Sequence, residues 1–316
     1  MLGTNGLAAL TRSRLTLRAH FCCRTVRSTL VTRCRGCDGG SCRDRLFRLP
    51  REKGRYGHPV RAGAMLSMTD CLLTGGMMEP DAKPTIVLIH GAFADASGWS
   101  EVIHRLSALG YSAYAPANPL RGVISDGDYV RTFLSTIQGP VVLVGHSYGG
   151  SVITNASVGA PNVRALVYIA AYAPDEGETL AAAGALDGAS NDLPGHLLVR
   201  PYPGMPDGDG DAYINPEFFH EQFCADLPDT LAAVMAVSQR PVTLSCLGTP
   251  SGPAGWKTLP SWYMVASNDN AIPPVAERAM AARAGAHTVE ISSSHVAFIS
   301  HPQETTDLIL AAVQGS

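Results

Sequence analysis

From residue 85 onward, short runs of β-branched and apolar residues alternate with amphipathic segments of helix length, and this alternation is the strongest constraint on the fold. Short apolar strands separated by helices are typical of βαβ units, because parallel strands need a crossover to connect them. The pattern predicts an α/β fold with a mostly parallel, doubly wound sheet. We expect strands at 85–90, 111–116, 140–144, 163–172, 262–266 and 287–291, and helices at 99–109, 126–138, 149–158, 273–284 and 302–313.

A long insertion separates the strands expected at 163–172 and 262–266. Its length of about 90 residues is too great for a simple connecting loop. Residues 181–186 and 215–237 have helix-like patterns, whereas residues 202–211 are rich in Gly, Pro and Asp and indicate a loop. We therefore expect a mainly helical cap at about 174–258, inserted after the strand near 163–172.

Residues 1–64 differ in composition from the rest of the chain. They hold 14 of the 24 Lys and Arg residues, three acidic residues and five of the eight Cys residues. Cys34 and Cys37 could begin a zinc site, but no second pair follows at ligand spacing, so we expect no metal. An Arg-rich, acid-poor segment fits a transit peptide, a disordered basic arm or an upstream extension before a later start. We expect residues 1–80 to do no chemistry and residues 81–316 to form the folded domain.

Composition also bears on partners and location. The basic charge of residues 1–64 leaves nucleic-acid binding open, but no folded reading motif accompanies it, so we expect no nucleic-acid partner. No apolar run approaches the roughly 20 residues that span a bilayer, so we expect no membrane association. The expected location is the cytoplasm, or an organelle if residues 1–64 act as a transit peptide.

The pentapeptide Gly145-His146-Ser147-Tyr148-Gly149 lies between an expected strand and an expected helix. It matches the Gly-x-Ser-x-Gly nucleophile elbow, in which glycines leave room for a serine on a strained strand-to-helix turn. The bare match is weak, because a glycine-rich turn without chemistry has the same letters. The strand before it and the helix after it favour Ser147 as a nucleophile.

A serine hydroxyl needs a base within reach and a third group that orients the base. Asp269 follows the strand at 262–266 and His295 follows the strand at 287–291, so both lie at the sheet edge that carries the elbow. His287 begins a strand and His301 begins a helix, which places neither on that edge. We predict Asp269 as the acid and His295 as the base; a capping role for Asp269 and a non-catalytic loop role for His295 are the alternatives.

Backbone N–H groups are the expected donors to a substrate oxyanion. One is the N–H of Tyr148, and the other is the N–H of Ala92 in the glycine turn after strand 85–90, where a plain connecting loop is the alternative. Aromatic residues that could line an apolar substrate pocket, or equally lie in the core, are Phe93, Trp99, Phe218 and Phe219.

Taken together, the motifs around Ala92, Ser147, Asp269 and His295 resemble the α/β-hydrolase family over about 84–314. Within it they are similar to the small metal-free group of plant methyl-ester esterases, hydroxynitrile lyases and bacterial carboxylesterases. The resemblance implies an α/β-hydrolase sheet with a cap and a Ser-His-Asp triad. It also implies hydrolysis of a small carboxylic ester through an acyl-enzyme, without a cofactor.

The same scaffold hosts several reactions, so the family does not decide the chemistry. Plant-type hydroxynitrile lyases are expected to have a lysine where this chain has Val296 and a threonine where it has Gly91, and both departures favour hydrolysis. A cofactor-free lyase or acyltransferase, and a non-catalytic binding protein of this fold, stay open as alternatives. The expected partner is a small-molecule ester, and the oligomeric state is open.

Overall fold

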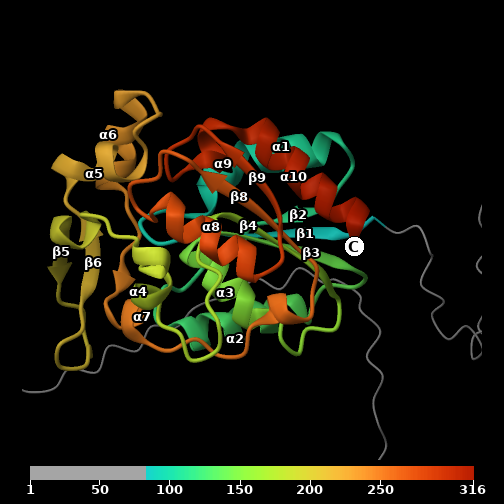
Figure 1. Cartoon of the computed structure of the whole chain (residues 1–316), viewed down its shortest axis with the longest axis horizontal. Helices are drawn as coiled ribbons and strands as arrows, with labels where there is room; N and C mark the ends of the chain where they lie inside the picture. Colours follow the sequence, from blue (N-terminus) through green and yellow to red (C-terminus); the bar gives the residue numbers. More distant parts are fainter. Residues whose placement is uncertain (1–82) are drawn as a thin grey trace, which may run out of the picture. The chain divides into compact units, whose positions relative to one another are not determined.

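Six parallel strands form the central sheet of the computed structural model, which describes residues 83–316 (Figure 1). The strand order β2-β1-β3-β4-β8-β9 changes direction beside β1, and every neighbouring pair is parallel. This arrangement confirms the predicted doubly wound α/β fold. The strands are β1 (Thr85–Ile89), β2 (Ala113–Tyr114), β3 (Val141–Ser147), β4 (Val163–Ala171), β8 (Ser261–Ala266) and β9 (His287–Ile291).

Burial along the strands follows their place in the sheet. All seven residues of β3 are buried, and β1, β4 and β8 are nearly as apolar and enclosed, as expected of parallel strands covered on both faces. The strand β9 is an edge and is largely exposed. On it Glu290 pairs with Arg278, which places charge on an edge that could otherwise pair with another chain.

Helices cover the two faces of the sheet. Helices α1 and α10 pack together on one face, and α2 and α3 pack together on the other (Figure 1). Helix α8 packs against β8, and the short α9 lies beside α10. The helices are α1 (Ser100–Ala108), α2 (Val123–Leu134), α3 (Tyr148–Ala156), α8 (Pro274–Arg283), α9 (Ala297–Ser300) and α10 (Pro302–Gly315), with a 3₁₀ turn η2 (Ala96–Trp99) before α1.

The insertion between β4 and β8 contains a small sheet as well as helices. The strands β5, β6 and β7 form an antiparallel sheet, so the expectation of a mainly helical cap was incomplete. These strands have two to four residues each, too few for an alternating pattern to be recognised in the sequence. The cap elements are α4 (Leu180–Ala183), η3 (Leu186–Gly188), η4 (Leu193–His196), β5 (Leu197–Arg200), β6 (Asp211–Ile214), α5 (Pro216–Phe223), α6 (Asp229–Val237), β7 (Val242–Thr243), α7 (Ser245–Gly248) and η5 (Gly255–Lys257).

Helix α2 begins earlier than the sequence indicated. We expected it to begin at residue 126, but it begins at Val123 and its N-cap is Gly122. The Asp126 carboxylate lies inside the first turn and reaches back to the backbone N–H of Arg121 at 3.0 Å.

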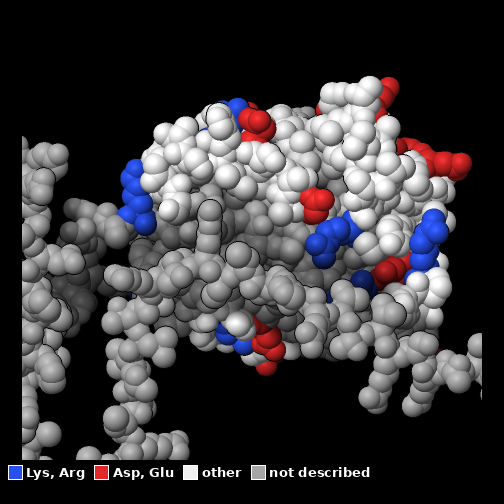
Figure 2. Space-filling model, turned by 180° about the vertical axis from the view of Figure 1, so that it is seen from behind, with Lys and Arg blue, Asp and Glu red and all other residues white. Residues whose placement is uncertain are grey.

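Charged side chains on the face seen in Figure 2 are scattered in small groups of mixed sign. Among residues 83–316, none of the helices is both long enough and apolar enough to cross a membrane. In the same range, no three His, Cys, Asp or Glu side chains form a cluster that could hold a metal ion. The expected extension at residues 1–80 lies outside the described residues.

Candidate active site

Ser147 lies at the end of β3, where the chain turns sharply into α3. Its backbone has φ 54° and ψ −125°, a left-handed conformation that is rare for a residue with a side chain. Such backbone strain persists only where the surroundings enforce it, and it is concentrated at functional sites. The turn therefore has the geometry of a nucleophile elbow.

The glycines on either side of Ser147 are required by close packing. A Cβ on Gly145 would lie 2.6 Å from the carbonyl oxygen of Gly149, and a Cβ on Gly149 would lie 2.3 Å from that of Ile89. Both distances are too short for real atoms. The spacing of the pentapeptide is thus explained by the crossing of β3, α3 and β1.

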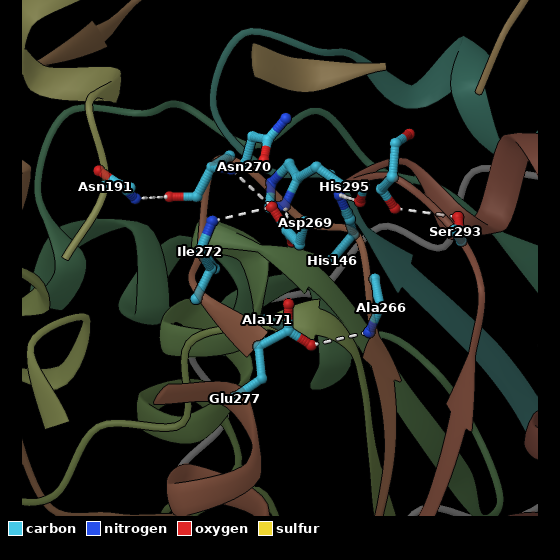
Figure 3. A network of polar contacts seen from close by, with 12 residues as sticks. His146, Ala171, Asn191, Ala266, Asp269, Asn270, Ile272, Glu277, Ser293 and His295 are labelled. Carbon is cyan, nitrogen blue, oxygen red and sulfur yellow. Dashed lines mark hydrogen bonds and ion pairs between the residues drawn. The ribbon is translucent and has the colours of Figure 1, made fainter. Parts of the chain in front are cut away.

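Asp269 and His295 meet in the interior at the carboxyl ends of β8 and β9 (Figure 3). The His295 Nδ1 lies 2.5 Å from the Asp269 Oδ2, and both side chains are buried. The other oxygen of Asp269 accepts from the N–H of Ala271 at 2.6 Å and of Ile272 at 2.9 Å. Asp269 thus orders the loop before α8, as a capping residue would, and also holds the histidine.

The competing histidines lie elsewhere. His287, on β9, packs against Trp262 of β8, with ring centroids 5.0 Å apart. His301 lies 3.8 Å from Glu304 at the start of α10. Neither contacts Asp269.

His146, the residue before Ser147, contacts the loop that carries His295. Its Nε2 lies 3.0 Å from the carbonyl oxygen of His295, and its ring packs between His295 and Phe298. Burial, together with the charge of nearby His295, lowers the pKa of His146 well below its ordinary value. His146 is therefore a neutral packing residue.

Ser147 and His295 line one cavity of about 140 Å³ under the cap. Ala92, Phe93 and Tyr148 also line it. Most of the remaining wall is apolar and comes from the cap and from the loop after Asp269: Tyr172, Leu180, Leu193, Leu197, Phe223, Leu247 and Ile272.

Three of the four aromatic residues expected at the pocket lie elsewhere. Trp99 is in the core against Phe298, with centroids 4.2 Å apart. Phe218 stacks on His196 at 3.9 Å, and Phe219 is buried in the cap beside Phe223. Among the four, only Phe93 lines the cavity that Ser147 also lines, because the packing of the whole fold decides which cavity a buried aromatic ring faces.

The loop after β1 packs directly against Ser147. A Cβ on Gly91 would lie 2.6 Å from the Ser147 Cβ, so only glycine fits there. The N–H of Phe93 donates to the Arg240 carbonyl oxygen in the cap at 2.9 Å. Within residues 83–316, the N–H groups of Ala92 and Tyr148 have no acceptor, which leaves them available to a ligand oxygen.

Comparison with known proteins agrees with this architecture. Residues 86–308 match the model of the Alpha/beta hydrolase family. The chain is 25% identical to the Probable hydrolase R7 of a Phoma species, over 72% of this chain and 97% of that protein. It is also 33% identical to a carbendazim hydrolyzing esterase of a Nocardioides species, but only over 30% of this chain and 45% of the esterase.

Solved structures show the same fold. A pyrethroid hydrolase from Sphingobium faniae JZ-2 superposes with a TM-score of 0.60 at 23% identity, covering 73% of this chain and 97% of that one. The family match spans well over half of the sequence, and the sheet order, elbow and cap insertion agree with it. The chain therefore belongs to the alpha/beta hydrolase family.

Proposed function

We propose that the protein is a serine hydrolase that cleaves small, uncharged carboxylic esters through an acyl-enzyme intermediate. The observation that carries the proposal is the buried contact between His295 Nδ1 and Asp269, beside the cavity that Ser147 also lines. A carboxylate at Nδ1 fixes the tautomer in which Nε2 is free to accept a proton. That is the state a base needs to activate a serine.

In the proposed mechanism, Ser147 Oγ attacks the ester carbonyl carbon and His295 Nε2 takes its proton. The N–H groups of Ala92 and Tyr148 donate to the developing oxyanion. Collapse of the tetrahedral species breaks the bond to the alcohol, which leaves with the proton from His295. Water then attacks the acyl-enzyme carbonyl carbon while His295 Nε2 takes its proton. His295 returns that proton to Ser147 Oγ as the acid is released.

The cavity supports a small apolar substrate. It has a volume of about 140 Å³ and mostly apolar walls, and Asn191 has the one side-chain amide among its lining residues. Within the described chain, no Lys, Arg, Asp or Glu side chain lines it, so a charged acyl group would lose its hydration without compensation. The names of the esterase and pyrethroid hydrolase relatives add support for ester cleavage.

The decisive experiment is labelling with a fluorophosphonate probe, followed by identification of the modified residue by mass spectrometry. We expect label on Ser147, and we expect Ser147→Ala to remove both the label and about 10⁴-fold of the hydrolysis of p-nitrophenyl acetate. Ser135→Ala, an exposed serine after α2, is the control and should leave both unchanged.

Each competing function predicts a different result. A non-catalytic binding protein would take no label at Ser147. An acyltransferase would take the label but form product mainly with an added acceptor alcohol instead of water. Label on Ser147 without any ester turnover would contradict the hydrolase proposal.

A further inference from the structure

Glu277, on α8, is a fully buried carboxyl group directly behind Asp269. Its Oε2 accepts from the backbone N–H of Ala266 at 3.1 Å (Figure 3). Its Oε1 has no donor partner within the described chain. A buried carboxylate without a cation and with one open lone-pair oxygen is energetically costly, so the protonation state of Glu277 needs an explanation.

The groups that face Glu277 offer no counter-charge in contact with it. Glu277 and Asp269 both contact the last residue of β8: the Ala266 N–H donates to Glu277, and the Ala266 carbonyl oxygen accepts from the Asp269 N–H at 3.2 Å. Figure 3 shows the Glu277 side chain next to Asp269. Tyr172 and Tyr263 are the other titratable groups near the two carboxyl groups. Arg278, the next residue, is turned to the surface, where its Nε donates to Glu290 at 2.9 Å. Two adjacent carboxyl groups in such a site cannot both be ionised, so they share one proton.

The donors around each carboxyl group decide where that proton resides. Asp269 receives the N–H groups of Ala271 and Ile272 and the Nδ1 of His295. Glu277 receives only the N–H of Ala266. Hydrogen bonds stabilise the charged form of an acid, so the proton resides on Glu277, which receives fewer of them. Burial, and next the charge of Asp269, raise the pKa of Glu277 well above its ordinary value, in agreement with this assignment.

We propose that Glu277 is a positioning residue for the triad: as a neutral carboxylic acid it donates a hydrogen bond to Asp269 and fixes that carboxylate against His295. The inference rests on the proposed function. A hydrogen bond donated to Asp269 also draws negative charge away from the carboxylate oxygen that faces His295. It therefore weakens the attraction between Asp269 and a protonated His295.

The test compares Glu277→Gln with Glu277→Leu in pH profiles of kcat/KM for p-nitrophenyl acetate. A glutamine amide can donate to Asp269 while its oxygen accepts from Ala266, so Glu277→Gln should keep the rate within about threefold and leave the acid limb in place. Leucine cannot donate, so Glu277→Leu should lower kcat about tenfold or more and move the acid limb to higher pH by about one unit. Glu176→Gln, an exposed glutamate, is the control.

An ionised Glu277 would give the opposite result. Glu277→Gln would then remove a negative charge near the histidine and move the acid limb to lower pH, which overturns the proposal. Equal profiles for the wild type and both variants would overturn it as well.

Infrared spectroscopy tests the proton on Glu277 without using activity. We expect the C=O stretch of a buried protonated carboxylic acid at neutral pH in the wild type, and its loss in Glu277→Gln, whose conservative change keeps the fold even if Glu277→Leu does not. An absent band overturns the inference. If the band is present but Ser147 takes no fluorophosphonate label, then Glu277 is neutral as inferred and the hydrolase function is the part that is rejected.

Discussion

The carboxylate of Asp226, in the cap loop between α5 and α6, accepts hydrogen bonds from both the backbone N–H and the hydroxyl of Ser294. The N–H bond measures 3.0 Å, and the same carboxylate accepts from the Ser293 hydroxyl at 3.0 Å. Ser294 directly precedes His295. The cap is therefore joined to the loop that presents the proposed base, one residue away from it.

Removing this link should loosen the histidine loop. We expect Asp226→Asn to lower kcat several-fold with a smaller effect on KM, because the loop carrying His295 loses its charged acceptor while the pocket wall is unchanged. The lost hydrogen bonds should cost about 1 kcal/mol of unfolding free energy. In a domain of this size that lowers Tm by about 2–4 °C. Asp207→Asn, on an exposed cap loop, should change neither kcat nor Tm.

The stability effect of Asp226 should depend on pH. Burial alone would raise the pKa of Asp226, but hydrogen bonds from Ser294 and Ser293 outweigh it and hold the pKa below its ordinary value. A carboxyl group whose pKa is lower in the folded state than in the unfolded state stabilises the fold. This stabilisation is complete above the unfolded pKa of about 3.9 and is lost as the pH falls through the folded pKa. The difference in Tm between the wild type and Asp226→Asn should thus be constant near neutral pH and should disappear at acidic pH. A difference that widens on acidification would contradict the assignment.

Substitution of Gly91 tests how closely the loop after β1 is packed against Ser147. Its substitution by alanine would place a Cβ 2.6 Å from the Ser147 Cβ and 2.9 Å from the His146 carbonyl oxygen. Either the loop or Ser147 must move, so we expect Gly91→Ala to lower kcat/KM about 100-fold, as misplacement by about 1 Å can. Gly248→Ala is the matched control, since no atom lies within 4 Å of its added Cβ. If both variants retain wild-type kcat/KM, the loop is not coupled to the nucleophile.

Much of the architecture was accessible from sequence because it depends on periodicity. The β-branched runs fixed the strands of the parallel sheet, and the rule that strand ends share one edge brought Asp269 and His295 to the end of the strand that carries Ser147. The structure confirms the fold and places these three residues together, while their catalytic roles stay predictions.

The remaining features depend on three-dimensional packing that leaves no local pattern. Phe93 and Phe218 are equally aromatic, but only Phe93 faces the cavity, because the cap geometry decides which side each ring occupies. Glu277 lies on a helix with little apolar character, where a glutamate is ordinarily solvated. Its burial follows from the position of α8 against β8, which no short stretch of sequence encodes.

Phe93 lies between the cavity that Ser147 and His295 line and a second cavity of about 230 Å³, which lies between the loop after β1 and helix α6. Its ring forms part of the wall of both, and it meets Phe223 edge to face at 6.2 Å. The second cavity is mostly apolar, with Leu231 and Met235 from the cap and Ile299 from α9. Under the proposed function, we therefore expect Phe93 to limit the length of the ester that the cavity beside Ser147 accepts.

Phe93→Ala should join the two cavities and shift preference towards longer acyl chains. Each buried methylene contributes about 0.8 kcal/mol, so the ratio of kcat/KM for p-nitrophenyl octanoate to that for the acetate should rise at least about tenfold. Phe218→Ala removes an equal ring that stacks on His196 outside the cavity, and it should leave the ratio unchanged. Since both variants lose the same volume, a ratio that rises equally in both would show that acyl selectivity does not depend on the Phe93 partition.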